Sequence, residues 1–223
     1  MPEQHSKIFC IRAFGPLACF TRPEMKVERM SYEVMTPSAA RGLLEAVLWK
    51  PAIFWRIHEI AVLSPIQWLS FRRNEVNDRA SPGSLEFFAD ERRAQRNTVA
   101  LRNVDYIVKA SFIMTERKGP EDNLKKFEEM FERRLSKGQC FQQPYFGCRE
   151  FSASLEPAPP SYTPIDKGVD RPLGLMFYDF LYGQRSGAKP MFFDARLKGG
   201  VLHVPSPEEV LAQNQAQHMG ASP

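Results

Sequence analysis

The sequence predicts an α+β fold: a ferredoxin-like domain over residues 1–151, followed by a small antiparallel β-sheet extension. Three observations lead to this prediction. Segments with strand and helix periodicity follow the order strand, helix, strand, strand, helix, strand, which is typical of a split βαβ domain. Three more strand-like segments come after a proline-rich stretch. The chain has 223 residues, 43% apolar and 25% charged, which is enough for a sizeable core.

The first strand is expected over Lys7–Phe14, and Gly15-Pro16 is expected to end it. The first helix should begin after Thr36, a good N-cap residue, with Pro37 at the first helical position. Its apolar stripe comprises Ala39, Ala40, Leu43, Leu44, Val47 and Leu48. Lys50-Pro51 is expected to end this helix.

Three strands and a loop are predicted next. Alternating apolar residues indicate a strand from Ile53 to Leu63, and a shorter strand is expected over Ile66–Phe71. The polar segment 74–97 is predicted to be an inserted, mobile basic loop, because it contains Ser81-Pro82-Gly83 followed by several arginines. A strong strand is then expected over Asn103–Thr115.

The second helix is expected from Pro120 to about Lys137, where Gly138 provides a C-terminal stop. Its apolar stripe comprises Leu124, Phe127, Phe131 and Leu135. The segment Gln139–Phe151 is predicted to form strand, turn and strand, with Gly147 at the bend.

Residues 152–205 are predicted to be a linker plus the β extension, and residues 206–223 a flexible tail. Five prolines between Pro157 and Pro172 indicate the linker. Lys198-Gly199-Gly200 is a suitable hairpin turn. The expected strands are Leu173–Tyr182, Pro190–Leu197 and Val201–Val204.

The composition excludes several classes of function. No apolar run approaches the ~18 residues of a membrane helix, and the first residues lack an apolar signal segment, so we expect a cytoplasmic protein without membrane contact. The four cysteines are widely spaced and the four histidines are scattered, so neither a metal site nor a cofactor is expected. Glycine-rich phosphate loops, nucleophile elbows and zinc-protease helices are absent.

Basic residues occur in groups, although the net charge is only +4. The main groups are Arg72-Arg73, Arg92-Arg93-Ala94-Gln95-Arg96, Lys125-Lys126 and Arg133-Arg134. Such groups can contact phosphates. Acidic residues lie between them, however, so the same groups also fit an ordinary solvated surface.

Several long blocks of sequence occur in an order typical of one enzyme family. They are Phe20–Lys26, Met30–Gly42, Trp49–Ala52, Arg72–Val76, Leu101–Tyr106, Gly138–Phe141 and Gly147–Phe151. In these blocks the chain resembles the type I-C (Dvulg subtype) CRISPR pre-crRNA endoribonucleases of the RAMP superfamily. The resemblance implies an RRM-like N-terminal domain and a β-rich C-terminal part. It also implies recognition of the repeat hairpin, metal-independent cleavage on its 3′ side, and retention at the crRNA 5′ handle.

The resemblance also implies the reaction and three site positions. A ribose 2′-OH attacks the adjacent phosphate and leaves a 2′,3′-cyclic phosphate. The family has a tyrosine, sometimes a histidine, just before Trp-Lys-Pro, and a Lys-His pair early in the second helix. This chain has Leu48 at the first position and Lys126-Phe127 at the pair. Lys126 is therefore expected to hold phosphate charge, whereas Leu48 and Phe127 cannot transfer a proton.

Two interpretations follow from these departures. In the first, the protein still cuts RNA, with Tyr32, Tyr106, Lys125 or His58 replacing the missing proton-transfer groups. In the second, cleavage is weak or lost, and the protein binds the handle as a structural subunit. An unrelated alternative is a generic RNA-binding module, although the RNP1 pattern is absent.

The expected partners are CRISPR repeat RNA, mature crRNA and the other subunits of the type I-C interference complex, with a monomer when isolated. Phosphate contacts are expected to position the RNA and to make its affinity salt-dependent. The residues predicted to contact RNA are Lys26, Arg29, Arg41, Lys50, Arg72, Arg73, Arg92, Arg93, Arg96, Arg102, Arg133, Arg134, Lys137 and Arg149.

Overall fold

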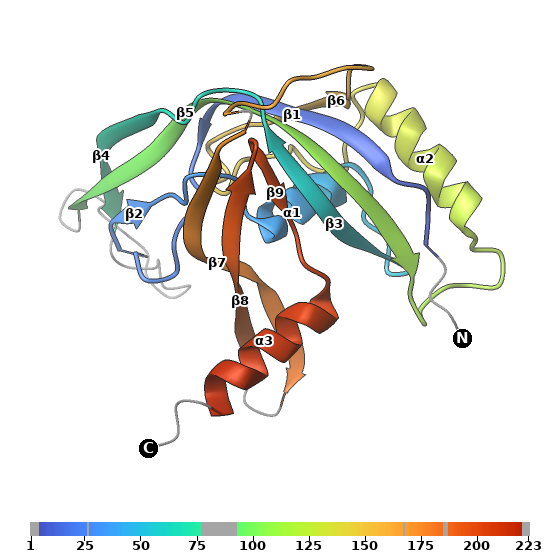
Figure 1. The fold of residues 1–223 in the computed structure, drawn as a ribbon. Helices are drawn as coiled ribbons and strands as arrows, with labels where there is room; N and C mark the ends of the chain where they lie inside the picture. Colours follow the sequence, from blue (N-terminus) through green and yellow to red (C-terminus); the bar gives the residue numbers. More distant parts are fainter. Residues whose placement is uncertain (1–4, 26, 77–92, 167, 185–186, 220–223) are drawn as a thin grey trace, which may run out of the picture.

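The computed structural model describes residues 5–25, 27–76, 93–166, 168–184 and 187–219. In this part of the chain, nine strands form one largely antiparallel sheet of order β6-β1-β5-β3-β9-β8-β7, with β2 and β4 also paired to β5 (Figure 1). The strands are β1 (Phe9–Ala18), β2 (Arg29–Met30), β3 (Ile53–Val62), β4 (Trp68–Val76), β5 (Arg93–Met114), β6 (Ser154–Pro157), β7 (Asp170–Gln184), β8 (Gly187–Lys198) and β9 (Val201–His203). The helices are α1 (Pro37–Val47), α2 (Leu124–Ser136) and α3 (Pro207–Met219).

The mixed α/β class and the first two predicted helices are confirmed. The Thr36 hydroxyl accepts a hydrogen bond from the N–H three residues later, and Pro37 opens α1 as predicted. In α2 the side chain of Asn123 has the same capping role, so this helix begins at Leu124 rather than at the expected Pro120. The first helix ends at Val47, earlier than the expected Lys50-Pro51.

The core joins the sheet to both of these helices. Trp55 of β3 packs against Phe131 of α2, with ring centroids 4.7 Å apart, and against Phe112 of β5 at 5.2 Å. Phe9 of β1 contacts the same Phe131 ring at 5.0 Å. Figure 1 shows α2 running along the sheet beside β1 and β6, while α1 lies under β3. These ring contacts hold α2 on the sheet, and Arg134 of α2 donates to the carbonyl of Val47 at the end of α1. The candidate site lies where the two helices meet.

The prediction of a loop over residues 74–97 is wrong at both ends of this segment. Residues 74–76 belong to β4 and residues 93–97 to β5, where Asn74 pairs with Gln95 and Glu75 with Ala94. An ion pair crosses between these two strands, because the guanidinium of Arg96 lies 3.4 Å from the carboxylate of Glu75. The segment 77–92 lies outside the described residues. The first strand also continues through Gly15-Pro16 to Ala18.

The C-terminal part differs from the prediction in three places. The segment Gln139–Phe151 is irregular, with one bridge between Tyr145 and Ser152, and β6 follows it and pairs with β1. The three predicted C-terminal strands are confirmed as β7, β8 and β9, and β9 pairs with β3, so they extend the same sheet. The predicted flexible tail contains α3.

Helix α3 forms because residues 206–209 cap it. The Ser206 hydroxyl accepts the N–H of Glu209 at 3.3 Å, and the Glu209 carboxylate accepts the N–H of Ser206 at 2.7 Å. The side chain of Asn214 then bonds to both the N–H and the C=O of Phe192, which fastens α3 to β8. No described helix is both long and apolar enough to cross a membrane.

Candidate nucleic-acid interface

The two substituted family positions belong to the core. Leu48 directly follows α1 and is fully buried, and its carbonyl accepts the indole N–H of Trp55 at 3.1 Å. Phe127, in the first turn of α2, is 2% exposed. Both side chains belong to the same hydrophobic cluster, so the structure explains these residues as packing groups.

Lys126 projects to solvent next to these buried residues. Its Nζ lies 3.0 Å from Oδ1 of Asp122, and the side chain is 44% exposed. The other carboxylate oxygen of Asp122 accepts the N–H of Gly119 at 3.0 Å. The bond from Gly119 lowers the pKa of Asp122 most, followed by Lys126, and the charge of Lys50 also lowers it. Lys126 and Lys50 therefore lie near the same carboxylate.

Because an α-helix has about 3.6 residues per turn, the polar residues of α2 lie on two faces of the helix. One, the basic face, contains Lys126, Met130, Arg133, Arg134 and, just past the helix, Lys137. The other, the acidic face, contains Lys125, Glu128, Glu129 and Glu132.

The two faces meet different parts of the chain. On the acidic face, Glu128 accepts the backbone N–H of Lys7 at 2.8 Å, and Glu132 pairs with Lys7 Nζ at 2.6 Å. On the basic face, the guanidinium of Arg134 donates to the carbonyl of Val47 at 2.8 Å, which turns this face toward the end of α1. A polyanion approaching the end of α1 would therefore meet lysine and arginine side chains of α2.

The proposed substitutes for the missing proton-transfer groups lie elsewhere. Tyr32 and Tyr106 are buried, which raises the pKa of each, and the Tyr32 hydroxyl accepts the N–H of Phe177. His58 is half-buried on β3, 2.8 Å from the Ser111 hydroxyl, and burial followed by the charge of His5 lowers its pKa. Lys125 lies on the acidic face, 4.0 Å from Glu129.

Three of the predicted RNA-binding arginines are paired with two acids. Arg73 bonds to both Glu75 and Glu150, and its distance to Glu75 is 2.9 Å. Arg29 lies 3.6 Å from Glu75 and 3.5 Å from Glu150, and Arg96 lies 3.4 Å from Glu75. This network joins β2, β4 and β5 to the segment before β6. Part of the positive charge of these arginines is therefore already balanced within the fold.

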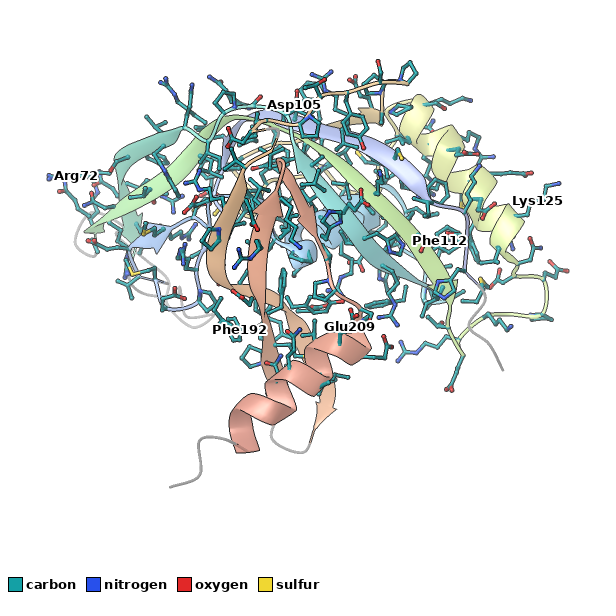
Figure 2. The ribbon with its side chains drawn as sticks, in the orientation of Figure 1. Arg72, Asp105, Phe112, Lys125, Phe192 and Glu209 are labelled. Atoms are coloured by element: carbon teal, nitrogen blue, oxygen red, sulfur yellow. The ribbon has the colours of Figure 1, made fainter. Side chains whose placement is uncertain are left out.

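The other predicted contacts are dispersed. Figure 2 shows Arg72, exposed on β4, and Lys125 at opposite sides of the molecule. The side chain of Arg102 donates to Gln67. Lys26 and Arg92 lie outside the described residues. Exposed arginines and lysines from the prediction are Arg72, Arg93, Arg102, Arg133, Lys137 and Arg149.

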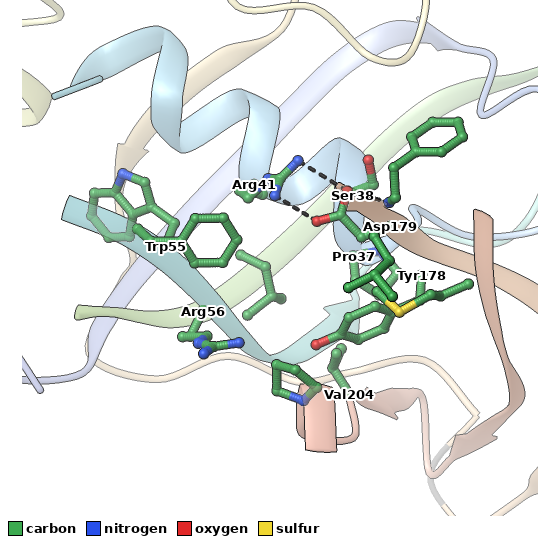
Figure 3. A pocket seen from close by; sticks show the side chains of 14 residues that line it. Pro37, Ser38, Arg41, Trp55, Arg56, Tyr178, Asp179 and Val204 are labelled. Atoms are coloured by element: carbon green, nitrogen blue, oxygen red, sulfur yellow. Dashed lines mark hydrogen bonds and ion pairs between the residues drawn. The ribbon is translucent and has the colours of Figure 1, made fainter. Parts of the chain in front are cut away.

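Arg41 faces the interior. Its guanidinium makes two bonds to the carboxylate of Asp179 on β7, and the side chains are only 17% and 12% exposed (Figure 3). They border a cavity of about 170 Å³ between α1, β3 and β7. Burial raises the pKa of Asp179, and the charge of Arg41 opposes that shift. The pair links α1 to the C-terminal strands.

Four acids that organise these sites have no role in the sequence-based prediction. Asp122 could have been found, because it lies four residues before Lys126, a spacing that pairs charges at a helix start. Glu75 lies two residues after Arg73, on the same face of β4, a spacing that can also be read in the sequence. Glu150 and Asp179 meet their partners over long sequence distances, so no local pattern marks them. In the described part of the chain no group of three His, Cys, Asp or Glu side chains is arranged to hold a metal ion.

Comparison with known proteins places the chain in a family. Residues 8–205 match the sequence model of CRISPR-associated protein Cas5, in its Cas5d form. A CRISPR pre-crRNA endoribonuclease Cas5d of Mannheimia succiniciproducens is 44% identical over 213 residues, covering 87% of this chain and 93% of the relative. The enzyme of the same name from Thermus thermophilus is 41% identical over 213 residues, covering 88% and 90%.

Solved structures agree on the fold. A crystal structure of a CRISPR-associated protein superposes with a TM-score of 0.73 at 24% identity, covering 94% of this chain and 97% of the other. A chain of a CRISPR RNA-guided surveillance complex gives 0.52 at 14% identity, covering 90% of each. With the match to the family model over most of its length, the chain belongs to the Cas5 family of CRISPR-associated proteins.

Proposed function

We propose that this protein is a pre-crRNA endoribonuclease of a type I-C CRISPR system. It recognises the repeat hairpin, cuts RNA on its 3′ side, and stays at the crRNA 5′ handle as a subunit of the interference complex. The observation that carries the proposal is the match, over most of both chains, to two relatives that bear this enzyme name. The basic face of α2 supports it, because a group of lysine and arginine side chains attracts phosphates.

In the proposed reaction the ribose 2′-oxygen bonds to the adjacent phosphorus and gives its proton to a base. The bond from phosphorus to the 5′-oxygen breaks, and that oxygen takes up a proton. The products are a 2′,3′-cyclic phosphate and a 5′-hydroxyl. Negative charge increases on the phosphate oxygens in the transition state, and we propose that Lys126 and Lys50, which both act on the Asp122 carboxylate, balance it.

A handle-binding subunit with weak or no cleavage is the second candidate. One observation favours it: Leu48 and Phe127 are buried apolar side chains at the positions where the family has proton-transfer groups. A missing general acid or base costs ~10²–10⁴-fold in rate. Slow cleavage that depends on positioning and on Lys126 therefore remains compatible with the site.

The finer fold and the setting are part of the same proposal. We propose a ferredoxin-like unit, supported by the strand order β6-β1-β5-β3 with α1 and α2 in the connections. Because its last strand is β6, its boundary falls near Pro157 rather than at residue 151. The remaining residues to 205 would be the β extension. The proposed partners are repeat RNA, crRNA and other subunits of the complex, and the proposed setting is the cytoplasm, with a monomer when isolated.

Cleavage of CRISPR repeat RNA tests this function directly. The full-length protein is incubated with labelled repeat RNA and with unrelated hairpins, each with and without EDTA. We expect cutting on the 3′ side of the repeat hairpin only, with a cyclic phosphate end and no effect of EDTA. Tight, specific binding without cleavage would favour the second candidate. Equal binding of all hairpins would favour a generic RNA-binding module.

A further inference from the structure

Two exposed aromatic side chains lie at the end of α1. Trp49 is 57% exposed and Phe141 is 76% exposed. Large aromatic side chains usually contribute their area to a core or to an interface. Neither ring is used by the core, so a role in binding explains their position better than a role in folding.

The backbone ties both residues to the same helix end. The carbonyl of Ala46 accepts the N–H of Phe141 at 2.7 Å, and the neighbouring Val47 carbonyl accepts Arg134. Trp49 follows Ala46 by three residues, so their α-carbons are at most about 11 Å apart. The irregular segment around Phe141 and the residues after α1 therefore present their aromatic rings from neighbouring positions.

The same residues lie along the basic face of α2. The guanidinium of Arg134 donates to the carbonyl of Val47. Near the start of α2, Lys126 bonds to the carboxylate of Asp122, and the charge of Lys50 acts on the same carboxylate. Eight residues of helix separate Lys126 from Arg134, a distance of about 12 Å. Trp49 stands between Val47 and Lys50 in the sequence, so its backbone passes between these two cations.

We propose that Trp49 and Phe141 form a stacking platform for unpaired bases of the RNA strand, beside the proposed cleavage site. The basic face holds the phosphates of that strand, and each ring takes the face of one base. A single-stranded nucleic acid is the occupant because the rings are flanked by cations, whereas an apolar protein partner would leave those charges unpaired. The proposal rests on the proposed function, since it specifies how the substrate lies at that site.

Binding to two RNAs tests the platform. The first is the repeat hairpin with its unpaired 3′ flank, and the second is the hairpin without the flank. Stacking contributes enough per base that Trp49→Ala and Phe141→Ala should each weaken binding of the first RNA at least about fivefold. Binding of the second RNA should not change. Trp49→Phe keeps a stacking ring and should restore most of the loss.

A matched control and a spectroscopic signal complete the test. Trp68 is also an exposed tryptophan, at 41%, but lies on β4, so Trp68→Ala should bind both RNAs like the parent. A 2-aminopurine base in the flank should be quenched by the parent protein and much less by Trp49→Ala. Circular dichroism melts show that each variant is folded.

Two results would overturn the inference and leave the proposed function standing. The first is a folded Trp49→Ala, Phe141→Ala double variant that binds flanked repeat RNA like the parent. The second is a loss that Trp49→Phe does not restore. A parent protein that does not prefer repeat RNA to unrelated hairpins would instead overturn the proposed function itself.

Discussion

Replacing Lys126 by methionine removes the positive charge that we propose stabilises the phosphate during cleavage, and cleavage should slow strongly. Methionine keeps an unbranched apolar stem of similar reach but removes the ammonium group. The side chain is 44% exposed and its ionic partner in the structure is Asp122. Exposed substitutions of this kind change stability by less than ~0.5 kcal/mol, so the melting temperature should stay close to that of the parent.

The size of the rate effect follows from the charge that is lost. At an effective dielectric constant of about 20, an ammonium about 4 Å from a phosphate oxygen interacts by about 4 kcal/mol. Lys126 already interacts with Asp122, so only part of that energy is available to the transition state. Loss of one positioned donor typically slows catalysis ~10²–10³-fold, and we expect the lower end. In a plot of the logarithm of the binding constant against the logarithm of the salt concentration, the slope should become shallower by ~0.7.

Single-turnover cleavage of repeat RNA measures the rate, and Lys125→Met is the comparison. Lys125 is next in sequence and 84% exposed, but it lies on the acidic face. If the basic face holds the RNA, the cleavage rate of Lys125→Met should be within about twofold of that of the parent. The reason is that water and salt screen an exposed charge that lies far from the phosphate. A folded Lys126→Met that cuts as fast as the parent, or equal losses in both variants, would refute the reasoning.

Three other substitutions test the remaining observations. Asp179→Ala removes both bonds between the buried Arg41 and Asp179 and leaves this arginine only Glu45, at 3.5 Å. It should lower the free energy of unfolding by about 3 kcal/mol in urea titrations, whereas Arg41→Met with Asp179→Leu should regain most of that loss. Because burial lowers the pKa of His58, the unfolded chain takes up the proton more readily, so stability should decline as pH falls below 6.5, and less so in His58→Gln. Leu48→Tyr with Phe127→His should speed cleavage of repeat RNA at least ~10-fold with an optimum near pH 6–7, while lowering the melting temperature; a folded double variant that is no faster at any pH would contradict this.

Local sequence patterns predict the elements whose backbone hydrogen bonds are completed by residues close in the sequence. Thr36 and Pro37 mark the start of α1, and the Gly199-Gly200 turn joins β8 to β9 with both residues at positive φ. A helix-capping pattern also marks the start of α3, because Ser206 and Glu209 form a capping box that can be read in the sequence. That tail was predicted to be flexible because its composition is polar.

Elements that depend on distant partners could not be predicted in this way. Strand β6 is four residues long and pairs with β1, whose residues lie 140 or more positions earlier. Glu150 contacts Arg73 and Arg29, which lie 77 and 121 positions earlier, so a list of basic residues could not show which charges were already paired. For the RNA-binding prediction, this means that exposure and pairing matter more than the number of arginines.

The buried state of Leu48 and Phe127 connects stability to chemistry at this site. A tyrosine or histidine that moves protons must reach solvent or substrate, and when buried it needs a hydrogen-bond partner. Leucine and phenylalanine have no such requirement and complete the contact between α1, α2 and β3. The packing that stabilises this helix junction is therefore gained at the two positions where the resemblance implies proton-transfer groups. Lys126 lies next to Phe127 in the sequence but outside the apolar stripe, and it keeps its charge in water. The RNA binding that we propose therefore does not require proton-transfer groups at these two positions.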